Sequence, residues 1–458
     1  MGLRSQFVIA ANRLPLKRTV RADRVIWERS PGGLVSAMQP VVERRRGVWV
    51  GWDGGIGRSP RDLKLGKFSL SPIRLDQREV ETFYHGFSNG TLWPLYHDAI
   101  QTPQFHRGWW DPYRDVNARF ARAIARHASR RASVWIHDYH LQLVPSMLRQ
   151  LRPDLRIGFF LHIPFPPEEL FAWLPWRSAI LRGLLGADLC AFQTEASASN
   201  FSRVSRRYTP AEGTDRELSI DRRSVSCVSL PISVDADTFE RLARSEGVQR
   251  RAAEIRGHLG GRRIILAVDR LDYTKGIADR LRAFEELLRE GKVDAEDVVL
   301  VQIAVPSREE SLGYDEVRRD VEQTVGRING MFSEPGKVAV HYFRRSLSQE
   351  ELTAYYLAAS VMAVTPLRDG MNLVAKEYVA SRVDHTGVLV LSEFAGAARE
   401  LRRALLVNPR DTDAFRGVLL QALRMPPSEA KMRMAVLRMQ VRRHDVYHWA
   451  EKFLEALG

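Results

Sequence analysis

Short apolar runs alternate with longer amphipathic runs along this chain, and the alternation restarts near its middle. The strand-like runs of the first half are residues 7–11, 47–51, 133–136, 157–161 and 189–192. Those of the second half are residues 264–268, 298–303, 338–342, 361–365 and 387–391, and helix-like runs separate them. Because strands that alternate with helices form parallel sheets covered on both faces, we predict an α/β fold with two doubly wound, Rossmann-like domains. Pro231 interrupts the strand-like run 225–234 and marks the join.

The chain is long enough for two full cores and shows no membrane or export signal. Its 458 residues are 45% hydrophobic and 27% charged. No apolar run approaches the roughly 18 residues of a membrane helix, and residues 7–11 are too short for a signal-peptide core. Cys190 and Cys227 lie in apolar runs, which predicts reduced thiols rather than disulfides or a zinc site. We therefore expect a cytoplasmic protein.

The charge balance is strongly basic. The 69 Lys and Arg residues exceed the 55 Asp and Glu residues by 14, which raises the hypothesis of a nucleic-acid-binding protein. The excess lies mainly on helix-like segments such as 119–131 and 241–256, interleaved with alanine and glutamate, and no nucleic-acid-binding motif accompanies it. We favour a solvated basic surface that also attracts small anionic substrates.

The segment Thr365-Pro-Leu-Arg-Asp-Gly-Met-Asn-Leu-Val-Ala-Lys-Glu-Tyr-Val379 is the most informative motif. A buried strand precedes it, Pro366 and Gly370 break the strand, and good helix formers follow from Asn372. A free helix N-terminus after a strand end is where an α/β protein binds an anion. The motif therefore predicts a site for a sugar and a phosphate.

A second polar turn, Val268-Asp-Arg-Leu-Asp-Tyr-Thr-Lys-Gly276, follows the strand-like run 264–268. Arg270 and Lys275 lie around one turn, where two cations can converge on a diphosphate and neutralise a leaving group. The alternative is a salt bridge from these cations to Asp269 or Asp272. The position at a strand end favours the diphosphate interpretation.

Two further strand ends carry polar side chains, in Trp135-Ile-His-Asp-Tyr-His140 and Phe159-Phe-Leu-His-Ile-Pro-Phe165. We expect Asp138 and His162 to bind sugar hydroxyls or to act as acid or base. His137 and His140 are interpreted as core or supporting histidines. No spacing among these residues matches a known metal motif, so a metal site is not favoured.

The N-terminal region adds weaker signals. In Ala11-Asn-Arg-Leu-Pro15 and Ser30-Pro-Gly-Gly-Leu34, a glycine-containing loop and Arg13 suit a sugar phosphate, although paired glycines alone are more often an ordinary turn. The aromatic segments 49–52 and 84–93 suit pyranose rings, but the residues alone favour core packing. The polar stretch 209–223 is predicted as a loop or hairpin.

Taken together, these motifs resemble the trehalose-6-phosphate synthase family of retaining glucosyltransferases (family 20), most closely its actinobacterial branch. The resemblance runs over nearly the whole chain and includes Arg327-Ile-Asn-Gly330 and Val390-Leu-Ser-Glu-Phe-Ala-Gly396. It implies a GT-B fold with the active site in the cleft between the domains. Residues 1–235, with a C-terminal helix 443–458 crossing back, would bind the acceptor, and residues 236–442 would bind the nucleotide sugar. Departures are a shorter segment 327–342 without tryptophan and no aromatic residue at 196–199.

The resemblance also assigns roles to single residues. Catalytic roles would fall to Asp138, His162, Arg270 and Lys275. The acceptor pocket would contain Arg13, Gly33, Trp52, Tyr84, Trp93, Asp138 and Arg308, with Arg13, Tyr84 and Arg308 on the acceptor phosphate. Donor binding would use Arg270, Lys275, Asp369, Gly370, Met371, Asn372 and Leu373, with His162 on the donor glucose and Glu377 on the ribose.

The implied reaction makes α,α-trehalose 6-phosphate from ADP-, UDP- or GDP-glucose and glucose 6-phosphate, on one face and without a metal or cofactor. The residues leave the base of the donor open. The expected partners are these two small substrates and further copies of the chain as a homo-oligomer, with no nucleic acid and no membrane.

Two other interpretations remain open. A sister transferase would use another phosphorylated acceptor, such as glycerol 3-phosphate or a cyclitol phosphate, and the presence of Arg13, Tyr84, Trp93 and Arg308 argues for glucose 6-phosphate instead. A catalytically silent regulatory subunit would have lost Arg270, Lys275, Asp369 or Glu377, and all of these are present.

Overall fold

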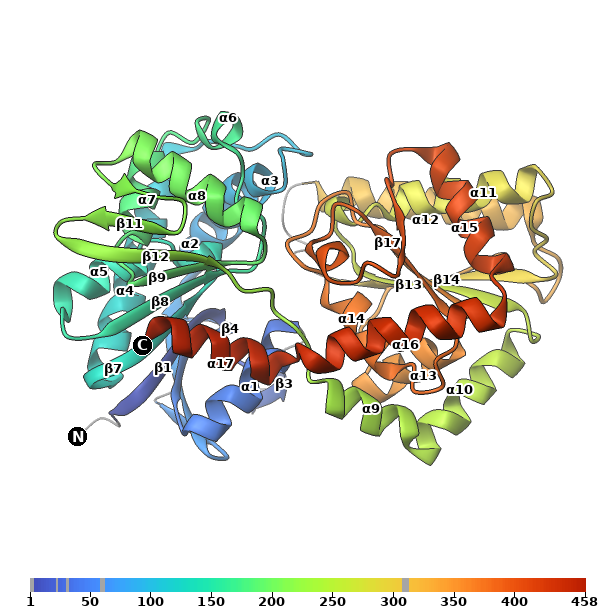
Figure 1. The fold of residues 1–458 in the computed structure, drawn as a ribbon, viewed down its shortest axis with the longest axis horizontal. Coiled ribbons are helices and arrows are strands. Elements are labelled where there is room, and N and C mark those ends of the chain that lie inside the picture. Colours follow the sequence, from blue (N-terminus) through green and yellow to red (C-terminus); the bar gives the residue numbers. More distant parts are fainter. Residues whose placement is uncertain (1–3, 22–23, 30–32, 58–61, 307–312) are drawn as a thin grey trace. The chain divides into compact units, whose positions relative to one another are not determined.

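The computed structural model describes residues 4–21, 24–29, 33–57, 62–306 and 313–458, which form two compact units (Figure 1). The N-terminal unit contains Met1–Pro231 and Tyr447–Gly458, and the C-terminal unit contains Ile232–Val446. The chain thus passes between the units after Pro231 and again after Val446, a few residues from the predicted joins at 235 and 442.

A large sheet forms the centre of the N-terminal unit. Its order is β10-β11-β12-β9-β8-β7-β1-β4-β6-β5, and β2 and β3 form a separate hairpin. The strands are β1 (Ser5–Arg13), β2 (Leu16–Arg21), β3 (Arg24–Arg29), β4 (Val48–Ile56), β5 (Leu63–Leu65), β6 (Phe68–Leu75), β7 (Ala128–His137), β8 (Arg156–Leu161), β9 (Leu189–Phe192), β10 (Glu212–Gly213), β11 (Glu217–Ile220) and β12 (Arg223–Ser229). The five predicted strands are its parallel centre, but the sheet is mixed, because β5, β10 and β11 pair antiparallel at its edges.

Helices connect these strands and cover the sheet. They are α1 (Gly33–Arg45), α2 (Gln77–Glu79), the π-helix η1 (Val80–Leu92), α3 (Trp93–Tyr96), α4 (Arg107–His127), η2 (Tyr139–Leu141), α5 (Val144–Leu151), α6 (Glu168–Phe171), α7 (Arg177–Leu184), α8 (Glu195–Tyr208) and α17 (Val446–Leu457). The stretch 209–223, predicted as a loop or hairpin, contains β10, β11 and the turn into β12, which pairs antiparallel with β11.

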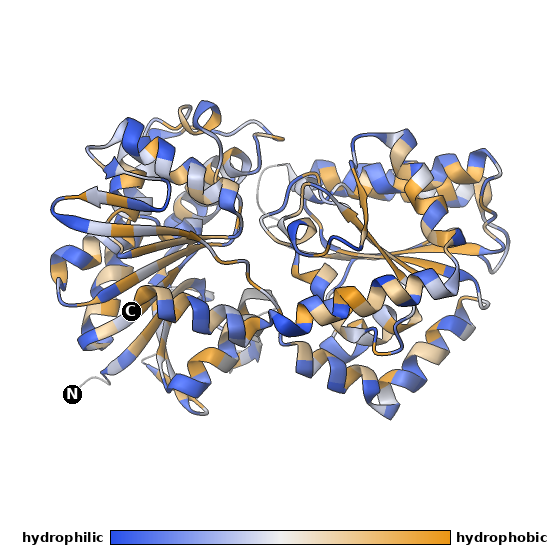
Figure 2. Cartoon of the chain, viewed as in Figure 1, coloured by the Kyte–Doolittle hydropathy of each residue, from blue (hydrophilic) through white to orange (hydrophobic). Residues whose placement is uncertain are grey.

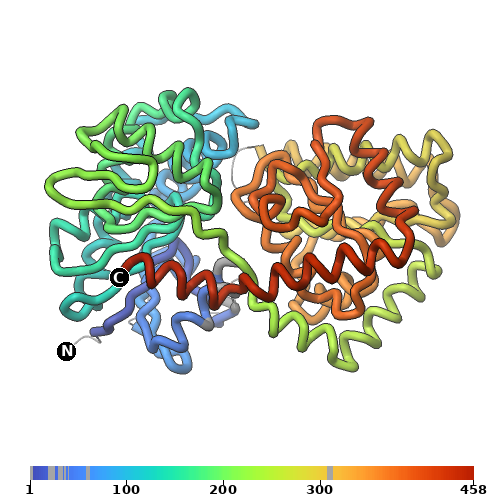
Figure 3. The backbone as a smooth tube through the Cα atoms, viewed as in Figure 1, coloured from blue at the N-terminus to red at the C-terminus, as the bar shows by residue number. Residues whose placement is uncertain are grey.

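The C-terminal helix α17 packs on the N-terminal sheet, where Figure 3 shows red chain beside the blue and green parts of that unit. The Phe453 ring stacks on Trp135 of β7 with centroids 4.0 Å apart. A Cβ atom at Gly158 of β8 would lie 2.6 Å from the same Phe453 ring, so only glycine leaves room for it. Residues from the two ends of the chain therefore share one core.

The C-terminal unit is a parallel doubly wound sheet of order β15-β14-β13-β16-β17-β18. Its elements are α9 (Ala236–Arg244), α10 (Glu246–His258), β13 (Arg263–Arg270), η3 (Tyr273–Lys275), α11 (Ile277–Arg289), β14 (Val298–Val305), α12 (Tyr314–Phe332), β15 (Val340–Phe343), α13 (Gln349–Ala358), β16 (Val361–Val364), α14 (Leu373–Ser381), β17 (Val388–Ser392), η4 (Gly396–Arg399), β18 (Leu405–Val407), α15 (Thr412–Arg424) and α16 (Pro427–Arg443). Figure 2 shows the strands as mainly apolar, as expected for a sheet covered on both faces.

Strand order locates where ligands bind in such sheets. The chain reverses its direction of travel across the sheet between β13 and β16 in the C-terminal unit, and between β1 and β7 in the N-terminal unit. Ligands of open α/β sheets bind at the carboxyl ends of the strands beside such a switch point. In the described part of the chain, no helix is long and apolar enough to cross a membrane.

Candidate active site

The loop after β13 holds the two predicted cations of the C-terminal unit. Arg270 is the last residue of β13, and Lys275 ends the short helix η3. The predicted alternative, salt bridges to Asp269 or Asp272, is wrong for Lys275. The Asp272 Oδ1 atom instead accepts from the Thr274 amide at 2.9 Å and starts the turn. Asp269 binds Arg280.

Lys275 instead forms an ion pair with the loop after β16. Its Nζ atom lies 2.6 Å from Asp369 Oδ2, and the two side chains are 8% and 16% exposed. The Asp369 carboxylate also accepts from the Asn372 side-chain amide at 3.2 Å. Because β13 and β16 flank the switch point, this pair joins the two predicted anion-binding motifs at one place.

Glycines allow these loops to come together. Gly276 has φ 61°, and a Cβ atom there would lie 2.6 Å from the carbonyl oxygen of Thr365. A Cβ atom at Gly396 would overlap the carbonyl oxygen of Gly370. The loop after β16 therefore packs against other backbone at Thr365 and at Gly370, before the start of α14.

The N-terminus of α14 is capped in a way that leaves amides available. Asn372 is the N-cap at φ 81°, and its Oδ1 atom accepts from the Ala375 amide at 3.2 Å. The preceding amides in the first turn, those of Leu373 and Val374, have no acceptor within the helix. These amides and the helix dipole favour an anion beside Lys275.

Glu377 lies one turn further along α14. The Tyr356 hydroxyl of α13 donates to its Oε2 atom at 2.9 Å. Burial raises the pKa of Glu377, and the hydrogen bond from Tyr356 opposes that shift. Tyr356 therefore orients the carboxylate and favours its charged form. Tyr356 was not predicted, because it belongs to a helix without a motif of its own.

A fully buried arginine lies beneath these loops. Arg280 of α11 donates to the Thr365 hydroxyl at 2.8 Å, to Gln302 Oε1 at 3.0 Å and to the Asp269 carboxylate. These groups come from β13, β14 and the end of β16. Arg280 was not predicted, since one arginine on an amphipathic helix is normally exposed.

The candidate residues of the N-terminal unit surround the end of β1. The guanidinium carbon of Arg13 lies 3.7 Å from the Trp52 ring centroid and 5.3 Å from that of Tyr84. Tyr84 in turn stacks on His140, with centroids 5.9 Å apart. Gly33 begins α1, and Arg308 lies outside the described residues.

Trp93 is buried and packs apart from Trp52, Tyr84 and His140. It is 3% exposed and packs against Tyr139 with centroids 5.7 Å apart. It is thus a core residue next to the predicted site, as the residues alone had indicated.

Asp138 has a backbone conformation that is costly for any residue except glycine. Its φ and ψ angles are 74° and 167°, a region that costs on the order of 1–3 kcal/mol. The carboxylate accepts from the His162 amide at 3.3 Å, which joins the ends of β7 and β8. Strain retained at a strand end beside the switch point supports a functional role for Asp138.

His162 forms a buried pair with His137. The His137 Nδ1 and His162 Nε2 atoms lie 3.0 Å apart. Burial lowers the pKa of His162 to about 3, and burial together with His162 lowers the pKa of His137 well below 6.5. Both rings are neutral at physiological pH, so His162 is suited to hydrogen bonding rather than to proton donation from an imidazolium.

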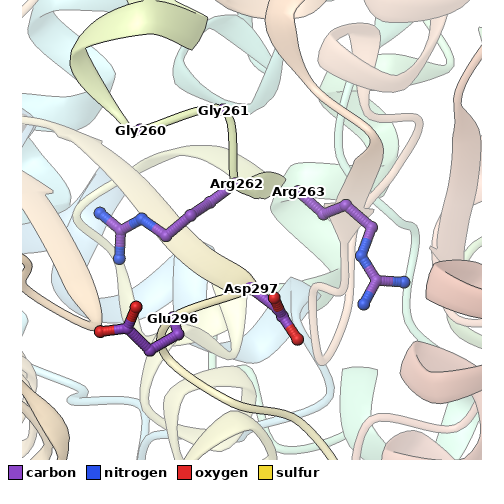
Figure 4. Close-up of a pocket in the computed structure, with 6 residues that line it drawn as sticks. All are labelled: Gly260, Gly261, Arg262, Arg263, Glu296 and Asp297. Carbon is purple, nitrogen blue, oxygen red and sulfur yellow. The ribbon is translucent and has the colours of Figure 1, made fainter.

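Other features of the described residues do not add to this site. No group of three or more His, Cys, Asp or Glu side chains there could hold a metal ion. A depression of about 350 Å³ opens beside Arg262 and Arg263 (Figure 4). It lies at the start of β13, and thus at the end of the strands opposite the candidate site. Its two arginines point away from each other, and Arg262 binds the carbonyl oxygens of Leu259, Ala295 and Val338.

Comparison with known proteins assigns the family. The model of glycosyltransferase family 20 matches residues 5–458. Trehalose-6-phosphate synthase of Mycobacterium marinum is 51% identical over 470 residues, covering 99% of this chain and 94% of the relative.

Two solved structures are similar throughout. One is an α,α-trehalose-phosphate synthase (UDP-forming) from Burkholderia xenovorans in complex with glucose 6-phosphate, with TM-score 0.90, 34% identity and coverage of 98% of this chain and 99% of that one. The other, from E. coli, is bound with UDP-2-fluoro glucose, with TM-score 0.90, 34% identity and 98% coverage of each chain. With its two doubly wound units, the chain therefore belongs to glycosyltransferase family 20 and is a glycosyltransferase.

Proposed function

We propose that this glycosyltransferase moves glucose from a nucleoside-diphosphate glucose to glucose 6-phosphate and forms α,α-trehalose 6-phosphate. The observation that carries the proposal is the Lys275–Asp369 pair, held beside the amides of α14 at the switch point of the C-terminal sheet. The names of the relatives and the two ligands bound by the solved neighbours support it.

Donor binding is assigned to the C-terminal unit. Arg270 and Lys275 clamp the diphosphate, and the first amides of α14 bind its oxygens. Asp369 and the backbone from Gly370 to Leu373 bind the donor glucose, with Met371 and Asn372 in that stretch. Glu377 accepts hydrogen bonds from the ribose hydroxyls, and its orientation by Tyr356 supports this role.

Acceptor binding is assigned to the N-terminal unit. Arg13, Tyr84 and Arg308 bind the acceptor phosphate, while Gly33, Trp52 and Trp93 line the pocket around the sugar. Asp138 accepts from an acceptor hydroxyl. The contact of Arg13 with two ring faces supports the assignment, because those faces orient the guanidinium without neutralising it.

The chemical step is proposed to occur on one face of the donor sugar. The bond from C1 of glucose to the diphosphate oxygen breaks, and the anomeric hydroxyl of glucose 6-phosphate forms the new bond to C1 from the same side. The departing phosphate oxygen takes the proton of that hydroxyl. No enzyme carboxylate attacks C1, and the cations Arg270 and Lys275 stabilise the charge on the leaving diphosphate.

His162 is assigned to the donor glucose as a neutral hydrogen-bonding group. The low pKa of His162, about 3, supports this form of the ring in the working enzyme. His137 holds the ring through the 3.0 Å contact between the two imidazoles. The histidine therefore positions the sugar, and the proton of the reaction goes to the leaving group.

One product assay tests the whole proposal. Purified protein is given UDP-, ADP- or GDP-glucose with glucose 6-phosphate, and diphosphate release and product mass are measured together. The proposal predicts trehalose 6-phosphate with at least one donor and only slow transfer to unphosphorylated glucose. Release only with glycerol 3-phosphate or a cyclitol phosphate would indicate a sister transferase, and no release with any acceptor would indicate a regulatory protein.

A further inference from the structure

A second basic depression lies in the N-terminal unit, away from the residues discussed above. It has a volume of about 490 Å³, within the size range of small-molecule sites. Its walls come from α5, the end of α7 and the β11–β12 hairpin, and its lining includes Arg149, Arg182 and Arg223. The first residue of β12 lines this depression, whereas Asp138 and His162 follow the carboxyl ends of the parallel strands β7 and β8. Because β12 runs parallel to these strands, the depression lies at the amino ends of the strands, opposite Asp138 and His162.

The three arginines differ in how far their charge is already compensated. The guanidinium of Arg149 binds both oxygens of Asp188 at 2.6 Å. Arg223 donates to the carbonyl oxygen of Leu185 at 2.7 Å, and among the described residues neither it nor Arg182 forms an ion pair. Arg182 is exposed on α7 and, within the same residues, has no hydrogen bond.

The charges near Arg223 are mixed. Burial lowers the pKa of Arg223, the neighbouring Arg149 lowers it further, and Asp188 and Asp221 raise it. A bound anion would oppose the effect of Arg149 on this pKa. One carboxylate, Asp221, also lines the depression, but it is exposed in the hairpin turn.

Neutral hydrogen-bonding groups complete the lining. Ser146 and Gln150 of α5 face the same space. The Ser146 hydroxyl donates to the Leu143 carbonyl at 3.3 Å. Gly186 lies against Ser146 so closely that a Cβ atom would overlap its backbone, which fixes the floor of the depression. The space is thus preformed rather than created by loose packing.

We propose that this depression binds a small phosphate-bearing molecule, separate from the two substrates of the transfer reaction. The guanidinium groups of Arg182 and Arg223, which form no ion pair among the described residues, match the charge and the several oxygens of a phosphate. The volume exceeds that of inorganic phosphate, so the natural ligand is a phosphorylated metabolite. The depression in Figure 4 differs, because its two arginines point away from each other.

Labelled pyrophosphate is the probe, and its binding is measured by equilibrium dialysis at physiological salt. We expect Arg182→Gln to weaken this binding at least about tenfold, the effect of losing a charge-assisted hydrogen bond. Arg122→Gln is the matched control, because Arg122 is an exposed helical arginine of the same unit outside the depression. Basal transfer activity should be the same in both variants.

Lys275→Ala separates this site from the proposed donor site. The variant should retain the Arg182-dependent binding, even if the assigned transfer function is wrong. Equal binding by wild type and Arg182→Gln, or an equal loss in Arg122→Gln, would overturn the proposal. An Arg223→Gln variant gives an independent check, provided its circular dichroism spectrum matches wild type.

Discussion

At the carboxyl ends of their strands, the two units orient their predicted ligand-binding cations by different contacts. In the N-terminal unit, Arg13 lies on the faces of Trp52 and Tyr84, and it forms no ion pair with the described carboxylates. In the C-terminal unit, Lys275 is paired with Asp369 at 2.6 Å. An aromatic face orients a cation without cancelling its charge. A cation that is paired with a carboxylate must instead interact with both that carboxylate and the ligand. We infer that acceptor binding depends on the orientation of the Arg13 guanidinium. Donor binding depends on a shift of Lys275 from its ion pair with Asp369 towards the diphosphate.

The largest effect should follow removal of the shared cation. Lys275→Ala removes the cation that pairs with Asp369 and that is assigned to the leaving diphosphate, so kcat should fall by about 10²–10³. Steady-state kinetics measure this, and Lys292→Ala, at an exposed lysine of the same unit, is the control. Wild-type turnover in Lys275→Ala would remove the basis for the diphosphate clamp.

The next effect concerns the close contact of the two donor loops. Gly276→Ala and Gly291→Ala place alanine at nearly equal φ angles, 61° and 63°, but only Gly276 faces a backbone oxygen. Both should lose about 1–2 kcal/mol of unfolding free energy through backbone strain. Gly276→Ala should lose at least about 1 kcal/mol more through overpacking, together with activity. Calorimetry measures the difference, and equal losses would show that the loops are not held by this contact.

Acidification should act on the N-terminal unit through its histidine pair. In the unfolded chain these histidines bind protons below about pH 6.5, whereas folded His162 does so only near pH 3. Their contribution to stability is therefore complete above pH 6.5 and falls as the pH decreases towards 3. When the pH is lowered from 7 to 5, the free energy of unfolding should fall in both proteins. The fall should be smaller in His137→Gln than in wild type, by up to about 2 kcal/mol.

Tryptophan fluorescence during urea unfolding measures this selectively, because all 10 tryptophans belong to the N-terminal unit. His258→Gln, at an exposed histidine of α10, is the control. An identical dependence on pH in His137→Gln and wild type would mean that the pair is not buried and neutral as described.

The smallest effect should come from the group that orients Glu377. Tyr356→Phe removes a hydrogen bond worth about 1 kcal/mol, so KM for the donor should rise about fivefold. Because that hydrogen bond lowers the pKa of Glu377, the variant should also lose donor affinity at a higher pH than wild type.

A donor without ribose hydroxyls provides the diagnostic comparison. It should bind wild type and Tyr356→Phe alike, since the oriented carboxylate then has no partner. Tyr355→Phe changes the neighbouring tyrosine, which has no described contact with Glu377, and should behave as wild type. A full Tyr356→Phe effect on the deoxy donor would reduce Tyr356 to a packing role.

The central parts of the fold and site follow from local sequence patterns. The parallel strands and the loops after β13 and β16 were predicted because each is a continuous segment with a clear period or helix start. The edge strands β10 and β11 lie in the stretch predicted as a loop or hairpin. The edge strand β5 and the π-helix η1 were not predicted, since short polar strands and widened helical turns have no distinct periodicity. The mixed edges of the N-terminal sheet are the clearest correction.

Pairings between distant segments could not be predicted. Lys275 and Asp369 are 94 positions apart, so the sequence indicated only nearby acidic partners for the lysine. Arg280 and Tyr356 reach the site from helices with no motif, and only three-dimensional packing brings them there. The strain at Asp138 is likewise a property of the folded backbone.

The most direct test of the central claim is calorimetric binding of each ligand to two variants. Arg13→Ala should lose most affinity for glucose 6-phosphate and retain affinity for the nucleoside diphosphate that the enzyme uses. Lys275→Ala should show the reverse. If each variant loses the other ligand instead, or if both ligands are lost together by two correctly folded proteins, the assignment of acceptor and donor to separate units is contradicted.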